Sequence, residues 1–365
     1  MRILEIVPRY FPNMGGVEII VQKISESLVT RGIPVIVYSV DLNNKLLRQQ
    51  KVNGVFVKRF KPLIGDPLFF PELKFFIDLK KENADIIHVH NIHILLPLFA
   101  TLFRKKKQKL LLQPHYHRFG QTSLRHFLFK LYKYVLNIMV FPRADIVIAN
   151  SSYERRILRE DFSKCRNLVS IPEGIDVDEL KVVKHCPDEP KRILYVGALK
   201  RYKNVDKILK SFAKLVKMGN ERFKLVIVGD GSEHANLLNL ARRLSVGNFI
   251  EWKHGLTRQQ LLCEYAKASV FILLSSLESF SRVVYEALLI GVPTVVLNFG
   301  ATEQLVKEGF AEGVNSLNQG EVANALLEST RKTYPRISEG SNTFLNWKEY
   351  SNKIVSIYHG LVETQ

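Results

Sequence analysis

The sequence predicts an α/β protein of two domains, each with a mainly parallel sheet between helices. The chain has 365 residues, which is too long for one ordinary hydrophobic core, so two domains are expected. Short apolar runs that suit buried strands alternate with helical patterns along most of the chain. A polar, charged stretch without clear periodicity, residues 177–190, separates two such series and contains Pro187 and Pro190.

We expect the first domain at residues 1–180 and the second at 190–345, with a last amphipathic helix within 346–365. The strands expected in the first domain are 2–7, 35–39, 86–90, 109–112 and 145–149, and those in the second are 192–196, 223–228, 248–252, 270–274 and 294–297. Most of these strands end in a polar loop, several of them with glycine. That arrangement gathers a ligand along one edge of a sheet.

Composition excludes several classes of protein. Hydrophobic residues make up 46% and charged residues 24%, as in an ordinary folded protein and unlike a disordered one. The three cysteines are widely spread without metal-type spacing, which favours buried thiols in a reducing cytosol. The chain begins directly with a predicted strand and contains no run of about 18 apolar residues, so neither a signal peptide nor a membrane span is expected.

The formal net charge is +18, and part of it is concentrated in one window. Residues 86–144 contain no Asp or Glu but ten Lys and Arg, and residues 124–140 form a basic amphipathic pattern. Its apolar stripe comprises Leu124, Phe127, Leu128, Leu131, Val135, Leu136 and Met139, with Phe129 and Tyr134 expected as additional exposed aromatics. Such a helix suits an anionic membrane surface, or its stripe packs inside its own domain. Nucleic acid is a weaker interpretation because no known binding module is present.

The stretch from 270 to 306 has the pattern of a ligand site. A buried strand at 270–274 is followed by a polar loop and then by a helix that Gly291 ends. If the helix starts near Ser281, its N–H groups and dipole make an anion site at the end of the strand. Glu278 lies in the loop and Glu286 about one turn into the helix, with seven residues between them.

This stretch resembles the E-x7-E signature of the retaining glycosyltransferases of family 4. The matching residues are Glu278, Phe280, Glu286, Ala287, Gly291, Val292 and Pro293, while Ser281 replaces the usual glycine. The opening of the chain, with Gly15, Gly16 and Glu18, is similar to that family's P-x-x-P-x-x-G-G-x-E segment. The resemblance implies the GT-B architecture: two doubly wound Rossmann-like domains facing a central cleft, with the C-terminal helix crossing back to the first domain.

The resemblance also implies roles for individual residues. Glu286 would bind the ribose hydroxyls and Glu278 the sugar hydroxyls near the departing phosphate. Gly16 and the backbone of Phe280, Ser281 and Arg282 would cradle the diphosphate. Gly15 and Gly229 belong to the strand-end loops that face the donor.

A cation is needed where the leaving phosphate develops negative charge. Lys203 matches the lysine of the family's G-R-x-x-x-x-K-G segment, whereas Ala198 stands where the arginine is usual. Lys200 or Arg201 is expected to take over from that arginine.

Histidines end two of the expected strands, His88 with His90 and His115 with His117. A metal site is not expected, because no carboxylate or cysteine lies near either pair and a spacing of i, i+2 at the tip of a strand is common by chance. The resemblance instead gives His115 a contact with the donor sugar that supports the reaction, with His117 as the fallback. No metal and no cofactor are expected.

The leading hypothesis is therefore an enzyme that moves a sugar from a nucleoside-diphosphate sugar to a lipid-linked or glycan acceptor at the cytoplasmic membrane face. We expect retention of configuration by front-face attack, because no carboxylate pair of the glycosidase type is evident. One alternative keeps the chemistry but uses a soluble acceptor. Another is a binding protein that kept the fold and lost turnover, for which Ala198 and Ser281 are the only support.

Overall fold

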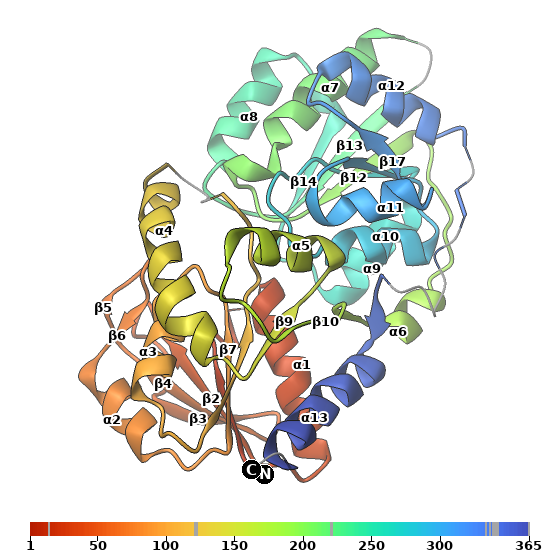
Figure 1. Ribbon diagram of the computed structural model, residues 1–365. Helices are drawn as coiled ribbons and strands as arrows, with labels where there is room; N and C mark the ends of the chain where they lie inside the picture. Colours follow the sequence, from red (N-terminus) through yellow and green to blue (C-terminus); the bar gives the residue numbers. More distant parts are fainter. Residues whose placement is uncertain are drawn as a thin grey trace. The chain divides into compact units, whose positions relative to one another are not determined.

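The computed structural model describes residues 1–13, 15–119, 123–219, 222–332, 334–335, 337 and 343–363 (Figure 1). It divides into two compact units. Unit 1 comprises residues 1–174 and 344–365, and unit 2 comprises residues 175–343. The fold class predicted from the sequence, α/β with two doubly wound units, is confirmed.

Unit 1 contains an eight-stranded sheet in the order β10-β9-β8-β7-β1-β2-β4-β3. Its strands are β1 (Ile3–Ile6), β2 (Val35–Val40), β3 (Gln49–Val52), β4 (Val55–Phe60), β7 (Ile86–His90), β8 (Lys109–Gln113), β9 (Ile146–Ala149) and β10 (Leu168–Ser170). All pairings are parallel except that of β3 with β4. Two short antiparallel strands, β5 (Pro62–Ile64) and β6 (Phe70–Pro71), form a separate pair.

Helices cover both faces of this sheet. They are α1 (Gly16–Thr30), α2 (Leu73–Lys81), α3 (Leu96–Phe103), α4 (Ser123–Val135), α5 (Ser152–Asp161) and the C-terminal α13 (Trp347–Glu363). Alternate strand residues feed two separate cores, as the two-residue period of a strand requires. Ile3 of β1 packs with α1 and α13, whereas Leu4 packs with α2 and α3. The last helix thus belongs to unit 1, on the face that α1 also covers (Figure 1).

Unit 2 contains a six-stranded parallel sheet in the order β14-β13-β12-β15-β16-β17. Its strands are β12 (Lys191–Val196), β13 (Phe223–Val228), β14 (Ile250–Lys253), β15 (Val270–Leu273), β16 (Thr294–Leu297) and β17 (Glu312–Val314). Its helices are α6 (Val177–Lys181), α7 (Val205–Lys217), α8 (His234–Arg243), α9 (Arg258–Lys267), α10 (Arg282–Ile290), α11 (Glu303–Lys307) and α12 (Gln319–Ser329). A short pair, β11 (Gly174–Ile175) with β18 (Leu345–Asn346), lies where the chain leaves and re-enters unit 1.

Both sheets reverse their strand order once. In unit 1 the first strand, β1, lies between β2 and β7, and in unit 2 the first strand, β12, lies between β13 and β15. In open parallel sheets, ligands bind outside the carboxyl ends of the strands at such a reversal point. Each unit therefore has one preferred place for a ligand.

The basic amphipathic segment turns a different face inward from the one expected. Phe129 and Leu136 are buried, so the prediction that Phe129 is exposed is wrong. Phe127, Leu131 and Tyr134 are 60%, 60% and 72% exposed, so these members of the sequence pattern do not pack in the core of unit 1. The helix carries apolar residues on two faces, and packing against the core selects the face with Phe129. The side chain of Leu124 lies outside the described residues.

Candidate active site

The reversal point of unit 2 carries a largely buried ion pair. Lys203 lies in a short 3-10 turn after β12, and Glu278 lies in the loop after the neighbouring strand β15. The Lys203 Nζ and a Glu278 carboxylate oxygen are in direct contact, and the two side chains are only 14% and 15% exposed. Burial by itself lowers the pKa of Lys203, but the negative charge of Glu278 outweighs it, and the pKa is raised. The ammonium group is therefore charged at neutral pH.

Asn204 holds the two loops together. Its backbone is left-handed (φ 55°), and its side-chain amide donates to the Leu274 carbonyl at 2.7 Å and to the Ser276 hydroxyl at 2.8 Å. The Ser276 N–H also donates to the Tyr202 carbonyl at 3.0 Å. Asparagine adopts the left-handed region more readily than most residues, which suits this position. These bonds fix the backbone on both sides of the Lys203–Glu278 pair.

Helix α10 begins beside this pair. Its first backbone N–H groups lack intrahelical acceptors, as in every helix, and its dipole favours an anion there. Ser281, the residue before the helix, has a φ of −109°, which lies outside the left-handed region that favours glycine. Serine can therefore replace the glycine that the sequence comparison led us to expect. Its hydroxyl is buried and has no hydrogen-bond partner among the described residues, and Phe280 stacks on Tyr285 at 4.7 Å between ring centroids.

Glu286 lies one turn into α10 and is almost fully buried. Its carboxylate accepts hydrogen bonds from Arg258 Nη1 at 2.8 Å and from the Tyr265 hydroxyl at 3.1 Å, both on α9. Arg258 also donates to Glu179 at 2.8 Å. Sequence reasoning missed Arg258 and Tyr265, since neither belongs to a recognisable spacing with Glu286. A ribose at this position would have to share the carboxylate with them.

The remaining cationic and glycine candidates of unit 2 lie on the same sheet edge. Lys200 is half-buried directly before the 3-10 turn, whereas Arg201 is exposed. Gly229 follows β13 with a φ of 150°, and a Cβ there would come within 1.9 Å of the Gly197 carbonyl oxygen. Glycine at 229 is thus required by the close contact between the two loops, whether or not it also contacts a ligand.

In unit 1, Gly15 and Gly16 lie at the start of α1, after β1. A Cβ on Gly15 would come within 2.6 Å of Glu18 Oε2, whereas a Cβ on Gly16 would meet no described atom within 4 Å. Glu18 is buried and pairs with Arg9 at 3.3 Å. The absence of a side chain at Gly15 therefore leaves space for the Glu18 carboxylate, and the absence of one at Gly16 leaves open space at the N-terminus of α1.

His115 follows β8 at the same edge of the sheet as Gly15, with a strained positive φ of 51° and 7% exposure. Its Nδ1 lies 3.0 Å from Asn150 Nδ2 and 3.9 Å from Glu173 Oε1, and its Nε2 lies 3.5 Å from His90 Nδ1. His117 lies outside this network, and its ring stacks on that of His93.

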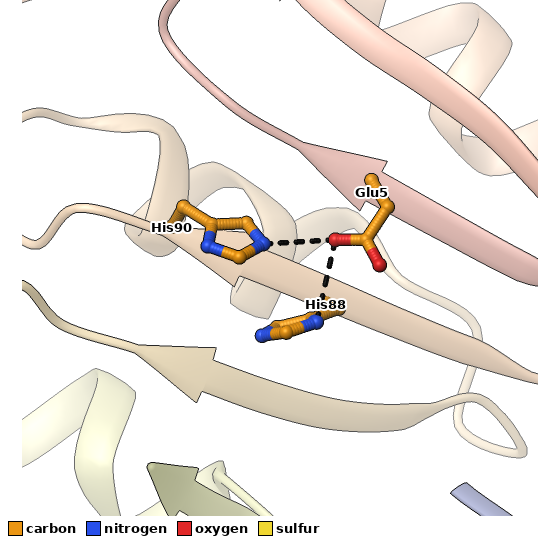
Figure 2. Close-up of side chains that lie close together, drawn as sticks. All are labelled: Glu5, His88 and His90. Atoms are coloured by element: carbon orange, nitrogen blue, oxygen red, sulfur yellow. Dashed lines mark hydrogen bonds and ion pairs between the residues drawn. The ribbon is translucent and has the colours of Figure 1, made fainter. Parts of the chain in front are cut away.

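The histidine pair at the end of β7 does have a carboxylate partner. Glu5 on β1 lies opposite His88 in the parallel pairing, and its Oε2 is 3.3 Å from His88 Nδ1 and 2.8 Å from His90 Nε2 (Figure 2). The statement that the pair lacks a carboxylate is therefore wrong, because strand pairing brings together residues that are distant in sequence. Sequence reasoning could have found Glu5 as a charged residue inside an apolar strand run.

Comparison with known proteins completes the assignment. Residues 176–334 match the family model described as glycosyl transferases group 1, and residues 14–179 match that of glycosyltransferase family 4. An uncharacterized glycosyltransferase of Methanocaldococcus jannaschii is 23% identical over 97% of this chain and 97% of its own length.

Two solved structures share the fold. Sucrose-phosphate synthase from Thermosynechococcus elongatus has a TM-score of 0.78 at 19% identity, covering 100% of both chains. An Anabaena protein in complex with UDP and glucose has a TM-score of 0.72 at 18% identity, covering 98% of this chain and 99% of its own. Because the two family models together span residues 14–334, the chain belongs to the family 4 glycosyltransferases and is a group 1 glycosyltransferase.

Proposed function

We propose that this glycosyltransferase transfers a sugar from a nucleoside-diphosphate sugar with retention of configuration and without a metal ion. The observation that carries the proposal is the buried Lys203–Glu278 pair beside the start of α10. Breaking the bond between the sugar and the β-phosphate places negative charge on a phosphate oxygen, which a cation and helix N–H groups stabilise. The UDP and glucose bound by the Anabaena protein support a donor of this class.

The chain's residues divide the work as follows. Lys203 and the first N–H groups of α10 hold the diphosphate, and the unpartnered Ser281 hydroxyl provides a further donor. Glu278 accepts hydrogen bonds from sugar hydroxyls, and Glu286 does so from the ribose. The acceptor oxygen attacks the anomeric carbon from the side of the leaving group, and its proton passes to the departing phosphate oxygen.

His115 contacts the donor sugar in this proposal, and either Lys200 or Arg201 adds a second cation. Gly16 lets the diphosphate approach the start of α1 because no side chain occupies that space. These roles are tested by measuring nucleotide affinity and the rate of sugar transfer separately for each variant. Only residues that contact the nucleotide should change its affinity.

We further propose a lipid-linked or glycan acceptor at an anionic membrane surface. Phe127, Leu131 and Tyr134 are exposed along one side of α4, at spacings of four and three residues, and exposed Lys130 lies next to Leu131. Among the described residues, no helix is long and apolar enough to cross a membrane.

Part of the positive charge in the window 86–144 is already neutralised by ion pairs within the fold. Several basic residues of the acid-free window pair with carboxylates from other segments: Arg104 and Lys109 with Asp145, Arg118 with Glu160 and Asp161, Arg125 with Asp66, and Lys133 with Asp161. The apolar ridge of Phe127, Leu131 and Tyr134 is therefore the better support for membrane contact. Flotation with anionic and with neutral liposomes tests it, with Leu131→Ser as the variant and exposed Val182→Ser, in unit 2, as the control. Absence of flotation with anionic liposomes would favour a soluble acceptor.

The donor is tested by thermal shift with UDP, GDP, ADP, dTDP and CMP, with magnesium or with EDTA. A ligand that binds only the folded chain must raise the unfolding midpoint by mass action. One nucleotide that raises it equally in EDTA supports a metal-independent donor site and selects the donors that carry that base. No shift with any nucleotide would favour a non-catalytic binding protein. The anomeric configuration of the product, read by NMR, decides retention.

A further inference from the structure

A buried polar network lies behind His115, on the face of the unit 1 sheet that α13 covers. Glu5, His88, His90 and Tyr358 are all fully buried there. The Glu5 carboxylate accepts from the Tyr358 hydroxyl at 2.9 Å. It also accepts from His90 Nε2 at 2.8 Å, and His88 Nδ1 lies 3.3 Å away (Figure 2). The Tyr358 hydroxyl and two imidazole nitrogens thus surround a fully buried carboxylate at the reversal point between β1 and β7.

These contacts determine where the protons lie. Although burial raises the pKa of Glu5, His88 and His90 lower it to about 2, so the carboxylate is ionised and only accepts. His90 must therefore carry its proton on Nε2. Burial and the neighbouring His88 lower the pKa of His90 to about 4, so its ring is neutral and its Nδ1 is an acceptor. The partner within reach of that Nδ1 is His115 Nε2, at 3.5 Å, which must then donate.

The other side of His115 agrees with this assignment. Its Nδ1, which carries no proton when Nε2 does, lies 3.0 Å from the Asn150 side-chain amide nitrogen, a donor. The Asn150 carbonyl oxygen accepts from Gln113 Nε2, which also donates to the Tyr350 hydroxyl of α13 at 2.9 Å. A donor meets an acceptor at each of these bonds from Glu5 to Tyr350, while Gln113 Oε1 has no partner among the described residues. Glu173, 3.9 Å from Nδ1, is the carboxylate that faces this side of the ring.

We propose that Glu5 and His90 are positioning residues that hold the His115 ring in one orientation and in the tautomer protonated on Nε2. The tautomer of an imidazole is set by the hydrogen bond that its other nitrogen makes, and here the chain of bonds ends on a buried charge. The proton of His115 is thus placed before any substrate binds. The effect on sugar transfer rests on the proposed role of His115, but the tautomer itself does not.

A metal ion is the competing interpretation of the same cluster, since the ligand atoms of Glu5, His88 and His90 all lie within 4.8 Å of one another. The contacts within the cluster favour hydrogen bonds between these side chains over a bound metal ion. The Tyr358 hydroxyl lies 2.7 Å from His88 Nδ1 and donates to Glu5, so both of these groups already have a hydrogen-bond partner. Zinc analysis of the purified protein tests this alternative.

The decisive measurement is the ring ¹⁵N spectrum of the full-length chain labelled in histidine, with His115 assigned through His115→Ala. We expect a protonated Nε2 and a bare Nδ1 for His115 at neutral pH. A proton on Nδ1 in the wild-type chain would overturn the inference, and so would one equivalent of zinc that is lost in His90→Leu. The wild-type spectrum decides the tautomer, and the one variant that this measurement needs, His115→Ala, serves only to assign the signal.

The matched variants are His90→Leu and His88→Leu. Both residues lie on β7, both are fully buried and both contact Glu5, but only His90 contacts His115. We expect His90→Leu to give a mixture of His115 tautomers and to lower kcat by about 10- to 100-fold without changing the nucleotide Kd. His88→Leu should leave the His115 spectrum and kcat unchanged. Equal effects of the two variants would indicate a merely structural role and overturn the inference.

Activity of His115→Ala separates the two proposals. If that variant transfers sugar at the wild-type rate, the proposed role of His115 in transfer fails, while the tautomer assignment stands on the spectrum. If the variant is inactive but the wild-type ring carries its proton on Nδ1, the positioning by Glu5 and His90 fails alone.

Discussion

Replacing Lys203 by methionine separates what the buried ion pair does for folding from what it does for catalysis. Methionine has similar length and fills similar space, but the Glu278 carboxylate, 15% exposed, loses its counter-charge. Removing one partner of a buried pair typically costs about 3–5 kcal/mol, and because both side chains retain some exposure we expect the lower end, about 3 kcal/mol. For a unit of this size that corresponds to a fall in Tm of about 6–12 °C.

The double variant Lys203→Met with Glu278→Gln removes the uncompensated charge, so most of this stability should return. Transfer should not return, because the cation that stabilises the leaving phosphate is still absent, and kcat is expected to stay about 10²- to 10³-fold below wild type. Thermal unfolding and a transfer assay with the donor identified by thermal shift measure the two effects on the same samples.

Lys207→Met is the matched control. Lys207 lies in the following helix and pairs with Asp206 at 3.3 Å, but the side chains are 37% and 38% exposed, so a change within about 0.5 kcal/mol is expected. Recovery of both stability and transfer in the double variant would refute the catalytic role of Lys203. Wild-type stability of Lys203→Met would refute the buried-pair reasoning.

Three further predictions follow from the described contacts. Gly16→Ala should fold normally but weaken nucleotide binding. Gly15→Ala should instead lower the Tm, because the Cβ of the introduced alanine would lie 2.6 Å from Glu18 Oε2. Wild-type nucleotide affinity of Gly16→Ala in a calorimetric titration would contradict the first expectation. Glu286→Ala should weaken nucleotide binding, while His115→Ala should bind nucleotide normally and transfer slowly; equal loss of binding in both variants is the contrary outcome. The pKa of His90 is lowered to about 4 by burial and by His88. As the pH falls, this histidine is therefore protonated in the unfolded chain before it is protonated in the folded chain. The free energy of unfolding should decrease by an amount on the order of 3 kcal/mol between pH 6.5 and 4, and should not depend on this group above pH 6.5. Urea midpoints across that range should fall less steeply for His90→Leu, and an unchanged slope would contradict the assignment.

The amino-acid sequence by itself determined the architecture and the family. Short apolar runs alternating with helical patterns predicted two parallel-sheet units, because strand and helix periodicities are local properties of the chain. The spacing of Glu278 and Glu286 around the start of a helix predicted an anion site at a strand end, and Lys203 was identified by its motif. Both the fold class and membership of the glycosyltransferase family are confirmed.

Only the tertiary structure decided which partners these side chains have. Glu5 meets His88 because β1 and β7 pair in parallel, and Arg258 meets Glu286 because α9 and α10 pack together. Local periodicity does not specify such pairs, since register and helix packing are decided by the free energy of the whole core. The same reason explains why Phe129 is buried: α4 carries apolar residues on two faces, and only packing against the rest of unit 1 selected one of them.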